Sequence, residues 1–268
     1  ISDMGFVSRL AWGAAFDYQA ARIAGLTCLA SDGGVFTCPH LVMPLGDPDR
    51  ERLLKVLAVV VPTFESMGWP LQILYVDEGR LPLFGDLPGF GVRTLVHDDF
   101  TDYVYDAEAL RTLSGKSLHG QKNQLNRFAR HCPDATTRPL AASDRDECLD
   151  LAARWCRERG IDCLDPRQSD LVPIRRVFDH YDAIPVLGAA IQAGGRIVAF
   201  AMGAWGNGDT ALVHFEKAES GLPGLYAAIS HRVATEVFPD ARWINREEDM
   251  GIPGLRQAKL ALGPVRRI

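Results

Sequence analysis

The sequence has no uninterrupted apolar run long enough to cross a membrane. Its longest apolar stretch, around residues 53–64, is broken by Lys55 and Pro62, whereas a bilayer needs about 20 predominantly apolar residues. The first residues also lack a basic segment followed by an apolar core, so we expect no signal peptide. These absences predict a protein without a stable membrane span.

An excess of positive charge is lacking as well. The formal net charge is -5 and the pI is about 5.8, which argues against a protein that coats nucleic acid with its whole surface. We therefore expect no DNA partner, although a local basic groove is compatible with this charge. The cysteines form no C-x-x-C pair and no Cys/His zinc spacing, so we expect reduced thiols that pack in the core of a cytoplasmic protein.

What the sequence does contain is an ordinary globular balance, with 47% hydrophobic and 24% charged residues. Hydrophobic periodicity and turn residues predict both helices and strands. The expected helices cover residues 5–15, 48–67, 114–131, 144–159, 171–180, 224–238 and 253–262. The expected strands cover residues 20–30, 34–43, 71–76, 92–97, 103–105, 186–192, 196–205, 210–218 and 243–245.

The order of these elements indicates the fold class. In the second half, an antiparallel meander is followed by a strand–helix–strand unit, which is the order found in acetyltransferase-like (GNAT) folds. The first half has a looser version of the same order. We therefore predict an α+β protein with two tandem GNAT-like halves, each a mixed sheet flanked by helices. The predicted domains are residues 1–135 and 136–268.

The expected helix at 114–131 has a cationic, amide-rich face without a carboxylate. Most charged faces are simply solvated, but the lack of Asp and Glu favours a face that binds anions and lines a cleft. Phosphates of tRNA, of a lipid headgroup or of coenzyme A would all suit it. The candidates for this phosphate-facing wall are Lys116, His119, Lys122, Asn126 and Arg127.

A second candidate site follows the expected strand at 243–245. Arg246, Glu247, Glu248 and Asp249 come directly after this strand, and loops held by a scaffold often carry function. Two Gly-x-Pro-Gly-Leu turns, at 221–225 and 251–255, begin the helices that follow neighbouring strands, where unpaired N–H groups are expected. The spacing of the acidic residues matches no calcium loop, so we expect no metal.

The strand at 210–218 carries a third candidate. Alternation along this strand predicts His214 and Glu216 on one face, and Phe215 and Lys217 on the other. A single histidine in a strand is more often structural than catalytic. Glu216 is the stronger candidate because it would end beside the first of the two glycine-proline turns.

Together, these segments resemble the family of the lysyl-phosphatidylglycerol synthase C-terminal (catalytic) domain, including its stand-alone bacterial members, which is related to Fem-type aminoacyl-tRNA transferases. The matching stretches are 102–106 (DYVYD), 113–119 (LSGKSLH), 122–128 (KNQLNRF), 215–218 (FEKA), 224–226 (GLY) and 244–259 (INREEDMGIPGLRQAK). They extend over more than half of the chain, and the last is the most specific. The resemblance implies two acetyltransferase-like halves with a cleft between them, and no metal or redox cofactor.

The first functional hypothesis is aminoacyl transfer from aminoacyl-tRNA to a hydroxyl or amine of a lipid or small-molecule acceptor. Such an activated ester needs little more than positioning, a base and hydrogen bonds to the developing oxyanion. The catalytic candidates are Glu216 or Asp249 as base, with Arg246 beside the donor. Besides the phosphate-facing wall, the donor-binding candidates are Phe215, Lys217, Gly224, Tyr226, Asn245, Glu247, Gly254, Arg256 and Lys259.

Two alternatives use the same fold. One is an acyl-CoA-dependent N-acyltransferase, but the usual acetyl-CoA turn, Gln/Arg-x-x-Gly-x-Gly/Ala, is not intact at residues 219–225. The other is a non-catalytic protein that holds an anionic ligand in its cleft. A screen of donors separates the two enzymes, and ligand binding without turnover would favour the third hypothesis.

Overall fold

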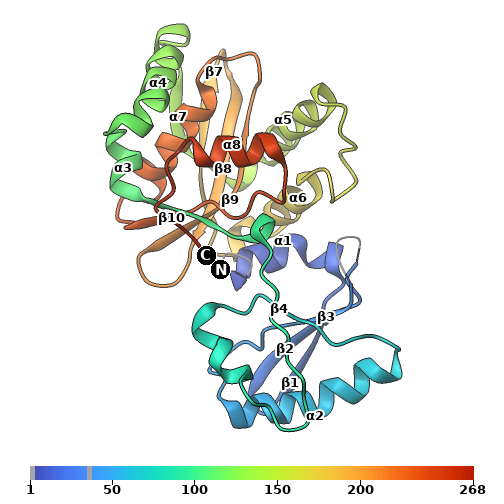
Figure 1. The fold of residues 1–268 in the computed structure, drawn as a ribbon. Coiled ribbons are helices and arrows are strands. Elements are labelled where there is room, and N and C mark those ends of the chain that lie inside the picture. Colours follow the sequence, from blue (N-terminus) through green and yellow to red (C-terminus); the bar gives the residue numbers. More distant parts are fainter. Residues whose placement is uncertain (1–3, 35–37) are drawn as a thin grey trace. The chain divides into compact units, whose positions relative to one another are not determined.

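The computed structural model describes residues 4–34 and 38–268, and the contacts between them divide the chain into two units (Figure 1). Of the described residues, unit 1 comprises Trp12–Val96, and unit 2 comprises His97–Ile268 together with residues 4–11. The division lies between residues 96 and 97, whereas the sequence predicted a boundary between residues 135 and 136. The difference arises because residues 103–131 pack with the second sheet. Helix α1 (Phe6–Phe16) lies where a helix was predicted.

Unit 1 is built on a small mixed sheet with strand order β1-β2-β3-β4. Its strands are β1 (Gln19–Ile23), β2 (Leu26–Ser31), β3 (His40–Val42) and β4 (Ile73–Leu74). Helix α2 (Arg50–Ser66) begins after Asp49, whose side chain accepts a hydrogen bond from a backbone N–H of the first turn. Buried side chains of the helix, among them Val56 and Phe64, pack against Leu26 and Leu41 of the sheet.

Two strand predictions in unit 1 were wrong. Residues 20–30 form a hairpin rather than one strand, because Ala24 and Gly25 both have positive φ (51° and 79°) and reverse the chain. Residues 92–97 form no strand, and Leu95 and Val96 are exposed. Of the strand expected at 34–43, residues 35–37 lie outside the described part of the chain.

Unit 2 contains a larger sheet with strand order β11-β5-β10-β9-β8-β7-β6. The strands β6 to β9 form an antiparallel meander, and β10 then pairs parallel to β9. The bounds of β8, β9 and β10 equal the predicted ranges. The strands are β5 (Tyr103–Asp106), β6 (Thr136–Pro139), β7 (Leu187–Ala193), β8 (Arg196–Trp205), β9 (Thr210–Ala218), β10 (Trp243–Asn245) and β11 (Arg266–Arg267).

Helices cover both faces of this sheet (Figure 1). On one face lie α3 (Ala107–Thr112), α4 (His119–His131) and α7 (Leu225–Arg232), which continues into a π-helical turn (Val233–Val237). On the other face lie α5 (Arg145–Glu158) and α6 (Leu171–Asp179), and α8 (Pro253–Leu260) follows β10. Short 3-10 turns occur at Glu78–Phe84, Asp98–Phe100, Lys116–Leu118, Ala142–Asp144 and Tyr181–Ala183. The helix expected from residue 114 therefore begins only at His119.

The parallel strands β9 and β10 separate after a short contact. Their pairing covers three positions, from Trp243 opposite Thr210 to Asn245 opposite Leu212. Over the described residues, β9 continues from Val213 to Ala218 with a strand partner, β8, on one side only. We call this opening the β9/β10 fork.

A β-bulge at His214 sets the direction of the side chains at the fork. Met202 of β8 pairs with Phe215, and the next residue of β8 pairs with Val213, so His214 is an extra residue in β9. Val213 before the bulge and Ala218 after it lie in the same core. Glu216 therefore shares the face of β9 that α7 covers.

Candidate functional site

An ion pair spans the β9/β10 fork. The Arg246 guanidinium, in the loop after β10, donates a hydrogen bond to Glu216 on β9, with Nη2 2.9 Å from Oε2. Its other terminal nitrogen donates to the Ser230 hydroxyl on α7. The side chains of Glu216 and Arg246 are 9% and 16% exposed. The structure thus brings two of the three predicted catalytic residues together, and adds Ser230, which the sequence reasoning missed.

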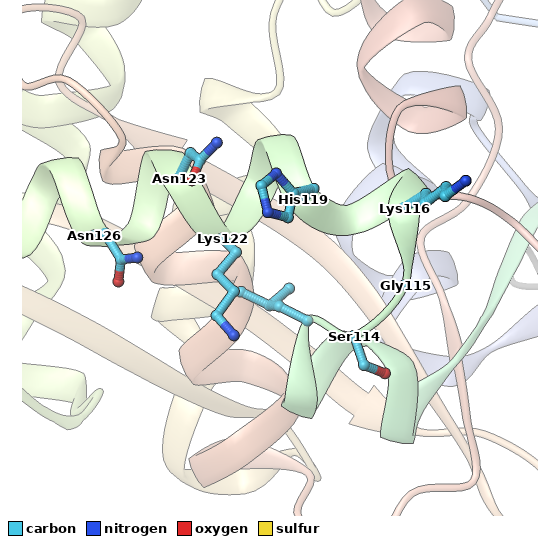
Figure 2. A pocket seen from close by; sticks show the side chains of 8 residues that line it. Ser114, Gly115, Lys116, His119, Lys122, Asn123 and Asn126 are labelled. Carbon is cyan, nitrogen blue, oxygen red and sulfur yellow. The ribbon is translucent and has the colours of Figure 1, made fainter.

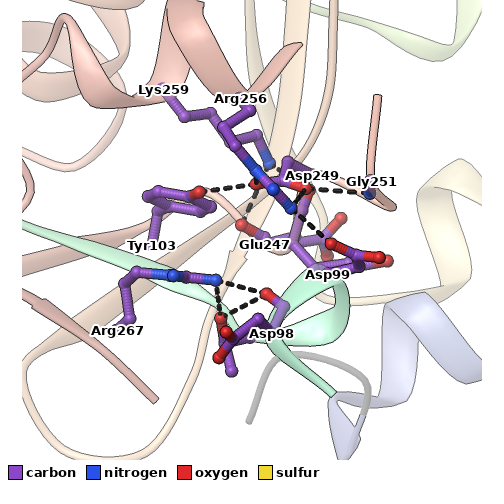
Figure 3. A network of polar contacts seen from close by, with 11 residues as sticks. Asp98, Asp99, Tyr103, Glu247, Asp249, Gly251, Arg256, Lys259 and Arg267 are labelled. Carbon is purple, nitrogen blue, oxygen red and sulfur yellow. Dashed lines mark hydrogen bonds and ion pairs between the residues drawn. The ribbon is translucent and has the colours of Figure 1, made fainter. Parts of the chain in front are cut away.

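The third predicted catalytic residue, Asp249, lies in a different environment (Figure 3). Its carboxylate accepts hydrogen bonds from Nε and Nη2 of Arg256 at 2.8 and 2.7 Å, from the Tyr103 hydroxyl at 2.5 Å and from the Gly251 N–H at 2.8 Å. The side chain is fully buried, and these bonds, with that of Arg256 first, hold the pKa of Asp249 well below its usual range. Four donors occupy the lone pairs of a carboxylate, so Asp249 has no free acceptor position for a substrate proton.

Lys259 also points into this loop rather than toward an outside ligand. Its ammonium group donates hydrogen bonds to the carbonyls of Arg246, Glu247 (2.9 Å) and Glu248. Burial lowers the pKa of Lys259 to about 8. Glu247 and Met250 adopt left-handed backbone angles (φ 61° and 52°), which are uncommon for residues other than glycine. Lys259 therefore fixes the backbone from which the Arg246 side chain extends.

Two further bonds tie the loop to the sheet. The Asn245 amide donates to the Asp102 carboxylate at 2.8 Å and its oxygen accepts the N–H of Glu247 at 2.8 Å. The Glu247 carboxyl lies 2.7 Å from Nδ1 of His214, the bulged residue of β9. Burial lowers the pKa of His214 to about 4. Burial, and then the charges of Glu248 and Asp102, raise the pKa of Glu247 well above its usual value.

The predicted residues Lys217 and Tyr226 meet on the α5 side of the fork. Lys217 pairs with Asp170 at 2.8 Å and lies 3.9 Å from the centre of the Trp155 ring. Trp155 donates a hydrogen bond from Nε1 to the Tyr226 hydroxyl at 2.7 Å. Trp155 was missed because no motif in its helix singles it out. Phe215 is buried in β9, the strand that also carries Lys217.

The two predicted glycines have different surroundings. Gly224 has φ 81°, and a Cβ built there would lie 2.0 Å from the carbonyl oxygen of Gln124 in α4. It therefore permits close packing of α7 against α4, which is a structural reason for glycine at this position. Gly254 lies exposed in the first turn of α8, with nothing near its missing side chain.

The residues of the predicted phosphate-facing wall are exposed. A concave surface of about 790 Å³ is lined by residues 113–116 and by His119, Lys122, Asn123 and Asn126 (Figure 2). Arg127 lies on the next turn of α4, outside this lining. Among the described residues, none forms an ion pair with Lys116, Lys122 or Arg127.

The described residues include neither a metal-binding cluster nor a helix suited to a membrane. No group of three or more His, Cys, Asp or Glu side chains within residues 4–34 and 38–268 is arranged to hold a metal ion. Over the same ranges, no helix has the length and apolar character required to cross a membrane.

Comparison with known proteins places the chain in a family. The model of the phosphatidylglycerol lysyltransferase C-terminal domain matches residues 11–267. The chain belongs to this family. The resemblance stated from the sequence is thereby confirmed, as is the α+β, GNAT-like fold class.

Several solved structures resemble the chain over almost its full length. A conserved protein of unknown function from Bacteroides thetaiotaomicron is 31% identical, with a TM-score of 0.87, covering 98% of this chain and 88% of that one. L-PGS from Bacillus licheniformis is 17% identical (TM-score 0.67, 98% and 85% covered). FemX is 11% identical (TM-score 0.64, 96% and 88% covered). At such low identity, the last two show the fold alone.

One curated relative is longer than the matched region. An uncharacterized protein from Mycoplasmoides gallisepticum is 24% identical over 206 residues, which are 72% of this chain and 62% of that protein. The chain thus spans less than two thirds of that relative. The family match covers residues 11–267, and the solved structures of low identity add the fold.

Proposed function

We propose that the protein transfers an aminoacyl group from aminoacyl-tRNA to a hydroxyl or amine of a lipid or small-molecule acceptor. The observation that carries the proposal is the Glu216–Arg246 pair across the β9/β10 fork, in a chain of the phosphatidylglycerol lysyltransferase C-terminal family. Aminoacyl-tRNA is a cytoplasmic metabolite, so this reaction belongs to the cytoplasm.

The chemistry asks for little beyond positioning and one base. The acceptor oxygen or nitrogen attacks the ester carbonyl carbon, and its proton passes to the Glu216 carboxylate. Collapse of the tetrahedral intermediate breaks the ester bond, and the terminal ribose oxygen of the tRNA leaves with that proton. Arg246 holds one Glu216 oxygen, which fixes the orientation of the carboxylate. Of the two candidate bases, only Glu216 remains, because all acceptor positions of Asp249 are occupied.

The loop between β9 and α7 supports tRNA over coenzyme A as donor. Acetyl-CoA enzymes bind pyrophosphate with free N–H groups of this loop. Here Glu219 is held by Arg196 in two hydrogen bonds and by Arg154 at 3.5 Å. Gly224 at the end of the loop lies directly against the backbone of α4. Because the acetyl-CoA turn is not intact at residues 219–225 and Gly224 is packed against α4, the loop is a poor site for a pyrophosphate.

A pool of charged tRNAs tests the proposal. The pure protein is incubated with the pool and with candidate acceptors, and loss of each aminoacyl ester is followed amino acid by amino acid. We expect one amino acid, or a small group, to be lost faster than without protein, with transfer to an acceptor. Saturable acyl-CoA binding with transfer to an amine would overturn the proposal in favour of an acyl-CoA enzyme. Ligand binding without turnover of any donor would indicate a non-catalytic binding protein instead.

A further inference from the structure

Positive charge is concentrated in one segment of an acidic protein. The chain carries a net charge of -5, yet residues 109–133 contain no Asp or Glu. Arg111 in this segment pairs with Glu108, but Lys116, Lys122, Arg127 and Arg130 form no ion pair with any described residue. Elsewhere in unit 2, unpaired exposed arginines also occur, such as Arg157 and Arg175, but only residues 109–133 combine four unpaired cations with the absence of any carboxylate in the segment. Unpaired cations on one face indicate a partner that supplies the negative charge.

The position of these cations within α4 points the same way. Helix N-termini carry partial positive charge and ordinarily attract acidic side chains. The first turn of α4 has no acidic residue and no side-chain cap, and Lys116, His119 and Lys122 lie at this end instead. Repulsion between these cations and the helix dipole is relieved when an anion binds there. The concave surface of Figure 2 lies at this end of the helix.

We propose that the exposed face of α4 docks the phosphate backbone of the RNA donor, an assignment that rests on the proposed aminoacyl-tRNA chemistry. Lysine and arginine neutralise phosphates, and the amides of Asn123 and Asn126 donate hydrogen bonds to phosphate and ribose oxygens. An anionic lipid surface is a poorer match. Membrane-surface helices insert apolar side chains, whereas Leu118 and Phe128 of this segment are buried inside unit 2.

The docking face is rigidly connected to the fork. The backbone of α4 lies against Gly224, the residue just before α7, and Phe128 packs in one core with Leu225 and Ile229 of α7. The same helix α7 carries Ser230, which accepts a hydrogen bond from Arg246. RNA held on α4 is therefore held at a fixed position relative to the Glu216–Arg246 pair. This pre-organisation matches what a reaction driven by positioning requires.

A matched pair of double variants tests the docking face. Lys122→Ala with Arg127→Ala removes two charges from α4, and Arg157→Ala with Arg175→Ala removes two exposed charges from α5 and α6 on the other face of the sheet. Binding of bulk deacylated bacterial tRNA is measured by filter binding at several salt concentrations. We expect the α4 variant to bind about tenfold more weakly, and its slope of log K against log[salt] to be smaller by about 1–2. The control should stay within about twofold of the parent.

Each outcome is decisive for the docking face. An unchanged affinity and slope in the α4 variant, or an equal loss in the control, would overturn it. Loss of binding to phosphatidylglycerol vesicles with unchanged tRNA binding would overturn it in favour of a lipid surface. Recovery by Lys122→Arg with Arg127→Lys supports a charge effect rather than misfolding. Because the probe is deacylated tRNA, the docking proposal can be correct even when no aminoacyl transfer is found. The two proposals can therefore fail independently.

Discussion

The charged residues of segment 245–259, which runs from the end of β10 through a loop into α8, contrast with those of helix α4 in how they are paired. In this segment, Asp249 is saturated by Arg256 and Tyr103, and Lys259 is bound to three carbonyls. On α4, the cations Lys122 and Arg127 are exposed and pair with no described residue. From the sequence alone, both regions were candidate sites because both are rich in charge.

The difference shows that charge density by itself does not locate chemistry. A charge that is buried and fully paired serves the architecture, because removing one partner leaves the other uncompensated. A charged group that still has an unused donor or acceptor position can bind a ligand. By this criterion Glu216 is intermediate: Arg246 donates a hydrogen bond to one of its oxygens, and its side chain is slightly exposed.

The largest effect is expected from Asp249→Asn, which removes the charge from the saturated region. The variant leaves Arg256 without its buried partner and places an amide donor where an acceptor is needed. We expect the free energy of unfolding to fall by about 2–4 kcal/mol, somewhat less than for a fully buried pair because Arg256 is 38% exposed. Urea unfolding, with the midpoint and slope compared to the parent, measures this loss.

Asp99→Asn is the matched control for this prediction. Asp99 pairs with the same nitrogen of Arg256 at 2.5 Å, but its side chain is 53% exposed. Exposed ion pairs contribute about 0–1 kcal/mol, so this variant should unfold close to the parent. If the two variants lose equal stability, Asp249 is not the architectural residue described above.

The next largest effect is expected from Glu216→Gln, which removes the base but keeps the shape of the side chain. Loss of a general base lowers turnover by about 10²-fold, so kcat/KM for aminoacyl transfer should fall by at least that factor. Glu236→Gln on the adjacent π-helical turn, where Glu236 pairs with Arg232 at 2.6 Å, is the control and should retain activity. Full activity in Glu216→Gln would show that the fork carries no base.

Local patterns in the sequence were sufficient for strands β7 to β9 of the meander in unit 2, whereas β6 (Thr136–Pro139) was not predicted. Strands β8, β9 and β10 were predicted with their observed bounds, because alternation and glycine-rich turns are both local signals. The hairpin at Ala24 and Gly25 was missed, since an Ala-Gly turn is a weaker signal than the Asp-Gly-Gly turn that follows it. The predicted strand at 92–97 was wrong because β propensity needs a partner strand, and this segment has exposed side chains instead.

Long-range partners account for what the sequence could not predict. Strand β5 pairs with β10, about 140 residues later, and this pairing brings residues 103–131 into unit 2. Asp249 receives bonds from Tyr103 and Arg256, and only the folded chain shows that these bonds exhaust its acceptors. The bulge at His214, which turns Glu216 toward α7, likewise arises from pairing with β8.

The smallest effect concerns the proton shared by His214 and Glu247. Burial lowers the pKa of His214 from its usual value to about 4, and raises the pKa of Glu247 above its usual value. From the usual pKa of a glutamate up to the raised pKa of Glu247, the folded pair holds one proton; the unfolded chain also holds one, on the histidine, up to about pH 6.5. While both states hold one proton, the contribution of the pair to stability should be flat. Where the unfolded histidine has lost its proton and folded Glu247 still keeps one, stability falls as pH rises.

Glu247→Gln separates the two groups, because it keeps a hydrogen bond to His214 and removes the titrating carboxyl. In the folded variant, buried His214 stays neutral and no neighbouring carboxyl carries a proton, whereas the unfolded histidine takes up a proton below about pH 6.5. The variant therefore loses stability as pH falls from about 6.5 toward 4, a range in which the stability of the parent should be flat. The difference in free energy of unfolding, parent minus variant, should decline by about 1 kcal/mol per unit as pH rises from about 5 to 7. Urea unfolding at fixed ionic strength across this range measures the difference, with Glu236→Gln as an exposed control that should show no slope. A difference that stays level would mean that the folded pair holds no proton in this range, with Glu247 ionised beside a neutral His214.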